Sequence, residues 1–345
     1  MSRPLRIGPR CEAFSRTRVV EIDVAQPTAE RHDLAGYGQA LVLLRVHGRP
    51  VGFLRVPCLY GRLRALDVQA ALETDADLAD RVQQALVRHW LLQQHPASRA
   101  PQPLPHWSVI ICTRGRPEDL TRCLDSLMAA RHEGGEIIVV DNDPPDDATR
   151  QVAARYPVKY VREPRRGLNW ARSGGARAAA GEILIYTDDD VVVDRDWIPS
   201  ILVPFAASRV GAVTGLTMPY EMESEPQELF ERYGGHRRGF DRKVFDNSVI
   251  PPAAAGLVGS GANMALRRDV VRDLRVFESE LDVGTAALSG GDAYAYYLVL
   301  ARGYQIVYTP EALVWHKHRR DRASLRKMLY AYGVGAFAFL TRAFL

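Results

Sequence analysis

The chain has 345 residues, of which 47% are hydrophobic and 25% charged, and its formal net charge is +4. This composition is typical of a globular protein, and so small a charge gives no support to nucleic-acid binding. The four cysteines show neither CxxC spacing nor a disulfide framework, which favours a reduced, cytoplasmic setting; they are Cys11, Cys58, Cys112 and Cys123.

The basic start of the chain, residues 1–10, is not followed by an apolar segment, so the sequence shows no secretory signal. No stretch reaches the roughly 18 uninterrupted apolar residues of a membrane-spanning helix. The nearest approach is the segment 333–340. The sequence therefore predicts a soluble protein, or at most a peripheral one.

The first part of the chain, residues 1–96, predicts a small α+β accessory module of unknown role. Alternation and turn residues predict strands, two of them in a hairpin, and apolar spacing after an acidic start predicts a helix. The strands are expected at 17–24, 39–46 and 51–56, and the helix at 75–94. The proline-rich stretch 97–106 is predicted to be a linker.

After the linker, strands alternate with helices. The strands are expected at 108–113, 136–142, 158–161 and 183–187, and the helices at 117–130, 146–155 and 168–180. This alternation predicts a doubly wound, mostly parallel sheet with helices on both faces. Ligands bind beyond the carboxyl ends of such strands. Polar residues follow three of the strands, at 113–114, 141–142 and 188–190.

The acidic triplet Asp188, Asp189 and Asp190 is the most informative of these groups. Adjacent carboxylates at the end of a buried strand repel one another and lose solvation, so stability alone does not favour them there. A divalent cation would offset the repulsion, and hard oxygen ligands suit Mg²⁺ or Mn²⁺. The triplet therefore predicts a metal–diphosphate site. Three solvated turn acids are the alternative.

Two common nucleotide-binding motifs are absent. The first strand is not followed by a GxGxxG fingerprint, and no GxxxxGK[ST] phosphate loop occurs in the chain. The loop after that strand, 113–117, reads TRGRP instead. Hydride transfer and P-loop chemistry are both disfavoured.

Five segments, taken in order, resemble the family 2 glycosyltransferases of GT-A fold. They are 108–127, 136–143, 167–191, 259–271 and 290–316. The resemblance covers about residues 107–320 and implies a metal-dependent inverting enzyme. Such an enzyme moves a sugar from a nucleotide-diphosphate donor to an acceptor hydroxyl, with Mn²⁺ or Mg²⁺ as cofactor. The acceptor class stays open between a glycan, a lipid-linked molecule and a natural product.

On the donor side, the resemblance implies one set of contacts to the nucleotide or its diphosphate. This set is Thr113, Arg114, Arg116, Asp141, Arg172, Asp188 and Asp189. A cap or turn role is the alternative for Asp141, and a solvated helix-face position is the alternative for Arg172. Asp188 is favoured for the ribose, while the role of Asp189 stays open.

At the metal, the resemblance implies Asp190 and His316 as ligands, with a structural histidine as the alternative for His316. His318 is expected to be solvated. Asp292 aligns with the base that deprotonates the acceptor, and a helix N-cap is its alternative. The acceptor and sugar side is expected to include Gly261, Asn263 and Gly291. For Gly261 and Asn263 the alternative is a tight turn. At the position of Gly291, relatives carry an acidic residue.

The tail, 321–345, combines basic residues with an apolar helical segment. It could lie on an anionic membrane at its inner face, or pack against the protein's own core or another subunit. Two other activities remain as alternatives for the whole chain. They are a non-catalytic nucleotide-sugar-binding scaffold and a sugar-1-phosphate nucleotidyltransferase, although the lysine-bearing loop expected of the latter is missing.

Overall fold

The computed structural model describes residues 14–27, 30–94, 103–130, 133–233 and 235–345. Most of the predicted linker and Cys11 therefore lie outside the described residues. Among the described residues, the central sheet contains nine strands, in the order β10-β12-β9-β11-β7-β4-β5-β6, with β8 paired to β12. Their bounds are β4 Trp107–Thr113, β5 Gly135–Asn142, β6 Lys159–Glu163, β7 Ile183–Asp188, β8 Val191–Val193, β9 Val210–Pro219, β10 Lys243–Phe245, β11 Asn263–Arg267 and β12 Gln305–His316.

The predicted parallel arrangement is confirmed for β4, β5, β6 and β7. β11 breaks the pattern because it lies antiparallel between β7 and β9. The register pairs Thr113 with Asp141 and Cys112 with Asp188. The polar residues that follow β4, β5 and β7 therefore come together at one edge of the sheet, as the strand pattern predicted.

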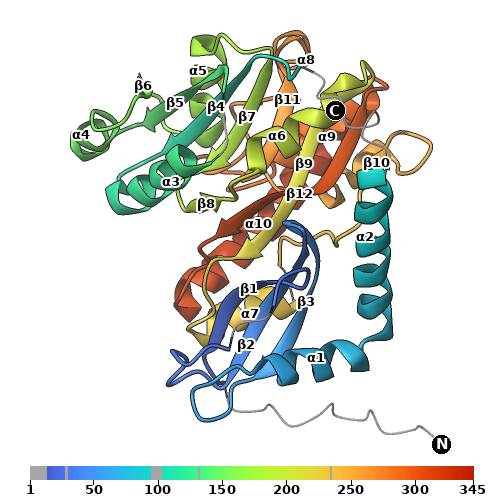
Figure 1. Cartoon of the computed structure of the whole chain (residues 1–345). Coiled ribbons are helices and arrows are strands. Elements are labelled where there is room, and N and C mark those ends of the chain that lie inside the picture. Colours follow the sequence, from blue (N-terminus) through green and yellow to red (C-terminus); the bar gives the residue numbers. More distant parts are fainter. Residues whose placement is uncertain (1–13, 28–29, 95–102, 131–132, 234) are drawn as a thin grey trace, which may run out of the picture.

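Helices cover both faces of the sheet (Figure 1). Because β4 is buried along its whole length, its alternating side chains contribute to two different cores. One core packs against α3, α4 and α6, and the other against α5, α8 and α9. The helices are α3 Pro117–Ala129, α4 Ala148–Ala153, α5 Leu168–Ala178, α6 Trp197–Leu202, α7 Glu225–Tyr233, α8 Arg268–Leu274 and α9 Gly291–Ala301.

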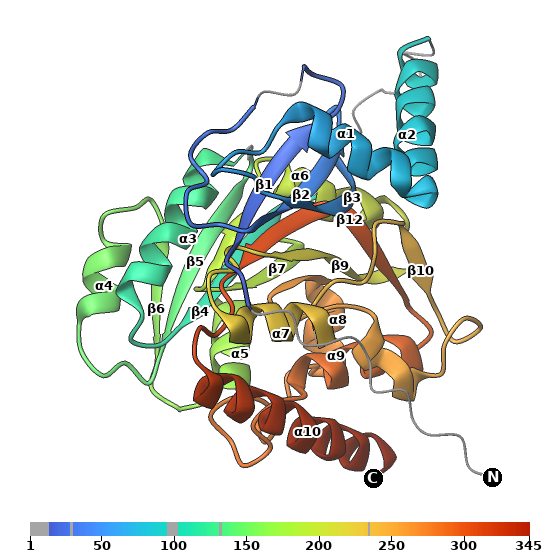
Figure 2. The same ribbon diagram turned by 90° about the horizontal axis from the view of Figure 1, so that it is seen from below.

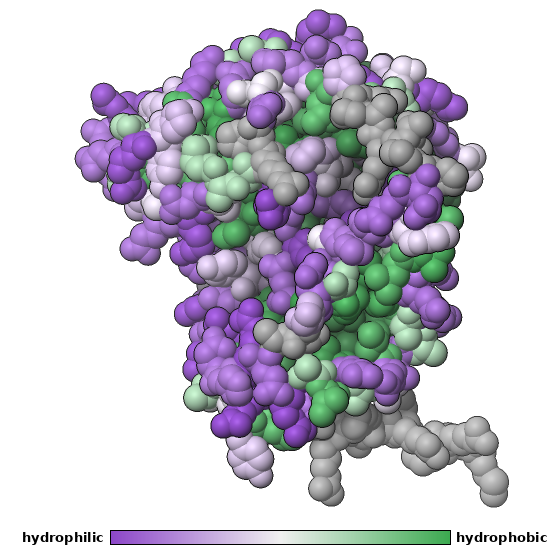
Figure 3. All heavy atoms as spheres, in the orientation of Figure 1, coloured by the Kyte–Doolittle hydropathy of each residue, from purple (hydrophilic) through white to green (hydrophobic). Residues whose placement is uncertain are grey.

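The N-terminal part forms a three-stranded sheet with two helices. Its elements are β1 Thr17–Asp23, β2 Gln39–Val46, β3 Arg49–Pro57, α1 Ala65–Thr74 and α2 Ala76–Gln94. The predicted hairpin is β2 and β3, and the predicted helix is α2. Helix α1 was not predicted because its apolar residues follow no clear helical spacing. Within this helix, burial is confined to Val68. Figure 3 shows apolar side chains where α1 and α2 lie; exposed ones include Leu66, Leu86, Val87 and Leu91.

The N-terminal sheet packs directly on the central sheet. Leu41 and Leu43 of β2 share a hydrophobic cluster with Leu216, Met218 and Trp315 of β9 and β12. Ion pairs surround this contact. They include Arg45 with Asp194 at 2.5 Å, Arg55 with Glu228 at 3.0 Å, and Arg49 with Glu311. In Figure 1 this sheet lies against one end of β9 and β12.

The predicted helical tail is α10, Arg322–Phe344, which packs against α9 and α7 (Figure 2). Gly290 has φ +99°, and a Cβ there would come within 2.5 Å of the Gly335 carbonyl oxygen. Glycine therefore permits the close approach of α10 to the start of α9. None of the described helices combines the length and apolar composition that a membrane crossing requires.

Candidate functional site

The first part of the site lies where β4 and β7 end. Thr113 Oγ1 donates a hydrogen bond to Asp189 Oδ2 over 2.7 Å. Arg116 Nη1 lies 3.0 Å from Asp189 Oδ1 and 3.1 Å from Asp190 Oδ2. Asp189 is therefore held by the loop that follows β4. Arg114 lies further out and pairs with Asp143 at 3.0 Å.

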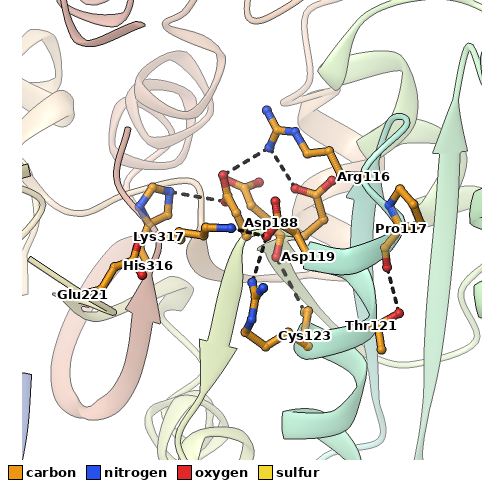
Figure 4. A network of polar contacts seen from close by, with 12 residues as sticks. Arg116, Pro117, Asp119, Thr121, Cys123, Asp188, Glu221, His316 and Lys317 are labelled. Carbon is orange, nitrogen blue, oxygen red and sulfur yellow. Dashed lines mark hydrogen bonds and ion pairs between the residues drawn. The ribbon is translucent and has the colours of Figure 1, made fainter. Parts of the chain in front are cut away.

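Asp188, Asp190 and His316 form a second group, in which one ligand atom from each lies within 4.8 Å of the others. Figure 4 shows Asp188 between Arg116 on one side and His316 on the other. His316 Nε2 is 3.4 Å from Asp190 Oδ1. The backbone N–H of Lys317 donates to the Asp190 carbonyl over 3.0 Å, which fixes the end of β12 beside the triplet.

The electrostatics of the triplet fit a cation. Burial, and then the charge of Asp190, raise the pKa of Asp188 to about 7. The same two causes raise the pKa of Asp189 to about 6, although Arg116 opposes them. Asp189 and Asp190 are buried, so the alternative of three solvated turn acids is wrong. Two carboxylates suit Mn²⁺ or Mg²⁺, and a neutral imidazole can complete a set of donors for Mn²⁺.

His318 does not have the solvated position that the sequence predicted. It is buried rather than solvated, with its Nε2 2.7 Å from Glu231 Oε1 and its Nδ1 3.0 Å from His316 Nδ1. Burial lowers the pKa of His316 to about 4, with the carboxylate of Asp190 acting in the opposite sense. His316 is therefore neutral, which is the form that binds metals.

Asp141 lies at the end of β5, beside the loop that follows β4. It is fully buried, and its Oδ2 accepts a hydrogen bond from the Tyr160 hydroxyl over 2.8 Å. Its Oδ1 is buried without a hydrogen-bond partner among the described residues. Burial raises the pKa of Asp141. Its predicted alternative, a helix cap or turn residue, is wrong because Asp141 belongs to β5.

Arg172 of α5 is buried rather than solvated on a helix face, so that alternative is also wrong. Its Nη1 donates to Asp282 Oδ2 over 2.7 Å and to Asn169 Oδ1 over 3.2 Å. Burial acts to lower the pKa of Arg172, but Asp282, then Asp188 and Asp292, raise it above its ordinary value. Arg172 is therefore a permanent positive charge among these carboxylates.

Asp292 lies in the first turn of α9, one position after Gly291. Its Oδ2 accepts from the Gly261 N–H and its Oδ1 from the Ala293 N–H, both over 2.8 Å. Gly290 is the N-cap, so Asp292 is not. A Cβ at Gly261 would lie 2.6 Å from Arg172 Nη2, so a larger residue there would displace the Arg172 guanidinium.

Asn263 is not placed to contact a sugar. It is fully buried, its amide donates to the carbonyls of Leu216 and Ala312, and its oxygen accepts from Trp197 Nε1. These bonds use its donors and its oxygen, so the geometry does not support the predicted sugar contact. Asn263 instead ties together β9, β12 and α6.

Asp282 is a polar member of the site that the sequence did not reveal. A Cβ at Gly291 would lie 2.4 Å from Asp282 Oδ2. The Asp282 carboxylate therefore lies directly against Gly291, where relatives were expected to carry an acid. Its segment, 277–289, has no periodic pattern, and Asp282 adopts φ +82°. A single aspartate in an irregular segment gives no signal until the chain is folded.

A family model described as Glycosyl transferase family 2 matches residues 108–275. The pre-mycofactocin glycosyltransferase of Mycobacterium tuberculosis is 26% identical over 288 residues, covering 82% of this chain and 56% of that protein. The chain thus spans little more than half of this relative. The succinoglycan biosynthesis protein ExoM of Rhizobium meliloti is 27% identical over 231 residues, covering 64% and 69%.

Among solved structures, the fold resembles the mannosyltransferase PcManGT from Pyrobaculum calidifontis in complex with GDP-Man and Mn²⁺. The TM-score is 0.52 at 20% sequence identity, covering 74% of this chain and 71% of that one. At this level of identity, the likeness concerns the arrangement of helices and strands.

Proposed function

The chain belongs to glycosyl transferase family 2 over residues 108–275 and has the GT-A fold, and from this premise we propose that it transfers a sugar from a nucleotide-diphosphate donor to an acceptor hydroxyl. The observation that carries the proposal is the group formed by Asp188, Asp190 and His316 at the carboxyl edge of the sheet. The groups that we propose for catalysis and donor binding lie around it, which supports an enzyme over a non-catalytic scaffold.

Asp188, Asp190 and His316 would hold a divalent cation, Mn²⁺ or Mg²⁺. When bound, such a cation supplies Lewis-acid stabilisation of the negative charge on a departing nucleoside diphosphate. Asp188 then has a metal role in addition to the ribose contact first expected of it. The neutral imidazole of His316 completes a set with two carboxylates, which leaves coordination positions for phosphate oxygens.

The nucleotide would lie over the ends of β4 and β5. Asp141 Oδ1, buried without a partner, can accept a hydrogen bond from the base. The Arg116 side chain is 39% exposed and reaches from the loop to the triplet, so it can also approach a diphosphate. Arg172 supplies a fixed positive charge between the triplet and Asp292.

Asp292 would act as the base. Its carboxylate is oriented by two backbone N–H groups, and a carboxylate retains lone pairs for a further hydrogen bond. An acceptor hydroxyl bound there loses its proton to Asp292 as its oxygen attacks the anomeric carbon. The C–O bond to the nucleoside diphosphate breaks in the same step, so the configuration at that carbon inverts.

A lipid-linked acceptor at an anionic membrane surface forms the second part of the proposal. Tyr330, Phe337 and Phe344 of α10 are 69%, 77% and 79% exposed. Arg326 and Lys327 lie exposed near them. Apolar and basic side chains on one exposed helix suit the headgroup region of an anionic bilayer. Because α10 packs against α9, it would bring Asp292 close to that surface.

Release of nucleoside diphosphate tests the central proposal. The protein, incubated with a panel of nucleotide sugars and Mn²⁺, is expected to release UDP or GDP from one of them. Asp190→Ala is expected to abolish this release. A panel in which no nucleotide sugar binds or is hydrolysed in the presence of metal would refute the proposal.

A further inference from the structure

His316 is the last member of a chain of hydrogen-bonded side chains that begins on α7, and the two other members, Glu231 and His318, are buried. His316 Nδ1 lies 3.0 Å from His318 Nδ1, and His318 Nε2 lies 2.7 Å from Glu231 Oε1. The side chains of His318 and Glu231 are each 1% exposed. Water therefore does not compete for these contacts, and the positions of the protons follow from the chemistry of the partners.

The protons can be placed one at a time from Glu231. A carboxylate accepts hydrogen bonds only, so His318 Nε2 carries the proton of the first contact. Neutral imidazole has a single N–H, so His318 Nδ1 is an acceptor. His316 Nδ1 must then be the donor of the second contact. His316 Nε2 is left with its lone pair, and this atom faces Asp190 Oδ1 at 3.4 Å.

The alternative is a protonated His318, which would reverse the second contact. The charge of Glu231 is already paired, because Arg237 Nη2 lies 3.0 Å from Glu231 Oε2. A buried imidazolium would therefore lack a free counter-ion. The neutral form of His318 accounts for the geometry without an additional buried charge.

We infer that Glu231 and His318 are positioning residues that hold His316 in its Nδ1–H tautomer and so keep Nε2 free for a divalent cation. This inference rests on the proposed function, which places the cation at His316. It extends the metal centre to α7, a helix outside the predicted set of site residues. Partners of this kind typically contribute 10–100-fold to metal affinity, as an order of magnitude.

Glu231→Gln is the sharpest variant because it is nearly isosteric. The carboxamide oxygen is expected to face the Arg237 guanidinium, since two donors there would repel. The NH₂ group would then face His318 Nε2 and force that atom to accept. In both histidines the proton would then move to the other ring nitrogen. His318 Nδ1 would donate to His316 Nδ1, and His316 Nε2 would carry a proton toward the metal position. His318→Phe is the second variant, because it removes the acceptor for His316.

Imidazole tautomers are measured first, by long-range ¹H–¹⁵N correlation spectra of the full chain without metal. The expected result is an Nδ1–H form of His316 and an Nε2–H form of His318, with His316→Gln and His318→Phe used for assignment. Glu231→Gln is expected to convert His316 to the Nε2–H form. An Nε2–H form of His316 in the unmodified protein would overturn the inference, whatever the outcome for activity.

Binding of Mn²⁺ alone is then measured from the electron paramagnetic resonance of the free ion. Glu231→Gln and His318→Phe are expected to raise the dissociation constant by about 10–100-fold. Glu228→Gln is the matched control, since Glu228 is on the same helix but pairs with Arg55 and Arg232. Equal affinities in all variants would overturn the inference, whereas an unmodified protein that binds no Mn²⁺ would overturn the metal proposal itself.

Discussion

At the scale of single residues, Arg172 links the two halves of the candidate site. Its guanidinium donates to Asp282, while the charges of Asp188 and Asp292 also act on it. Burying an arginine is costly unless several partners share its charge. Here one cation interacts with Asp282 and with the charges of Asp188 and Asp292, the carboxylates proposed for the metal and for the base, so we expect it to help position the donor relative to the base.

Asp292→Asn is expected to retain donor binding while slowing transfer by about 10²–10⁴-fold, the usual contribution of a general base. The carboxamide oxygen can still accept from a backbone N–H, but the group cannot take up the acceptor's proton. Turnover and donor-induced thermal shift measure the two effects separately. Asp269→Asn is the control, because Asp269 also accepts from the next N–H, that of Val270. Turnover near that of the unmodified protein would exclude Asp292 as the base.

Asp188→Asn is expected to stabilise the protein when metal is removed with EDTA. The folded-state pKa of Asp188 is raised to about 7, so the folded chain holds this proton more tightly than the unfolded chain. Stability is therefore lost as the pH rises from about 4, where the unfolded chain releases this proton, to about 7, where the folded chain gains a repulsive charge beside Asp190. At pH 8 the variant should gain about 1 kcal/mol or more in free energy of unfolding.

Denaturant unfolding with and without Mn²⁺ checks this prediction. The unmodified protein should be stabilised by Mn²⁺ through mass action, and Asp188→Asn should respond much less. A metal-free variant less stable than the unmodified protein at pH 8 would contradict the electrostatic account of the triplet.

At the scale of elements, α7 and α10 shape the surroundings of the site. α7 supplies Glu231 to His318, and α10 covers the start of α9 and leaves an apolar and basic face exposed. Both lie outside the strand–helix alternation that predicted the central sheet. Their contributions therefore depend on how they pack and not on a motif.

Phe337→Ser combined with Phe344→Ser is expected to weaken binding to vesicles with anionic lipid by about tenfold or more, because two large apolar groups no longer enter the interface. Co-flotation with vesicles of mixed phosphatidylcholine and phosphatidylserine measures the effect. Leu66→Ser in α1 is the control, since Leu66 is 71% exposed but far from α10 in sequence. Unmodified protein that does not float with these vesicles would contradict the membrane proposal.

At the scale of the whole molecule, the N-terminal sheet and the central sheet share one hydrophobic cluster. Leu41 and Leu43 contact the strands that end at Pro219 and His316. The sheet therefore supports β12 close to the point where that strand presents His316. An accessory role for residues 1–96 remains a prediction, but its removal would expose this cluster.

Leu43→Ala is expected to reduce the free energy of unfolding by about 2–5 kcal/mol, the usual cost of a cavity in a packed core. Because the cluster is shared, both sheets should unfold in one transition, followed by far-ultraviolet circular dichroism and tryptophan fluorescence. Leu59→Ala, at a residue 50% exposed, should have little effect. Two separate transitions would show that the sheets are independent.

The sequence alone predicted the parallel strands β4 to β7 of the central sheet and the position of the acidic triplet. Buried parallel strands are continuous apolar runs, and ligand-binding residues follow them directly, so local pattern carries this information. The resemblance to family 2 glycosyltransferases added Asp292 and His316 to the predicted site. The same resemblance placed Asn263 near the sugar. Its hydrogen bonds to other parts of the fold, which argue against that role, are known only from the structure.

Only the tertiary structure decided which polar groups meet. Asp282 lies more than a hundred residues after Arg172, and Glu231 lies more than eighty before His318, so neither pair has a local signature. The structure also separated the three acids of the triplet: Asp189 is held by Thr113 and Arg116, while Asp188 and Asp190 face His316. Burial and hydrogen bonding depend on contacts between distant segments, and these exist only after the chain has folded.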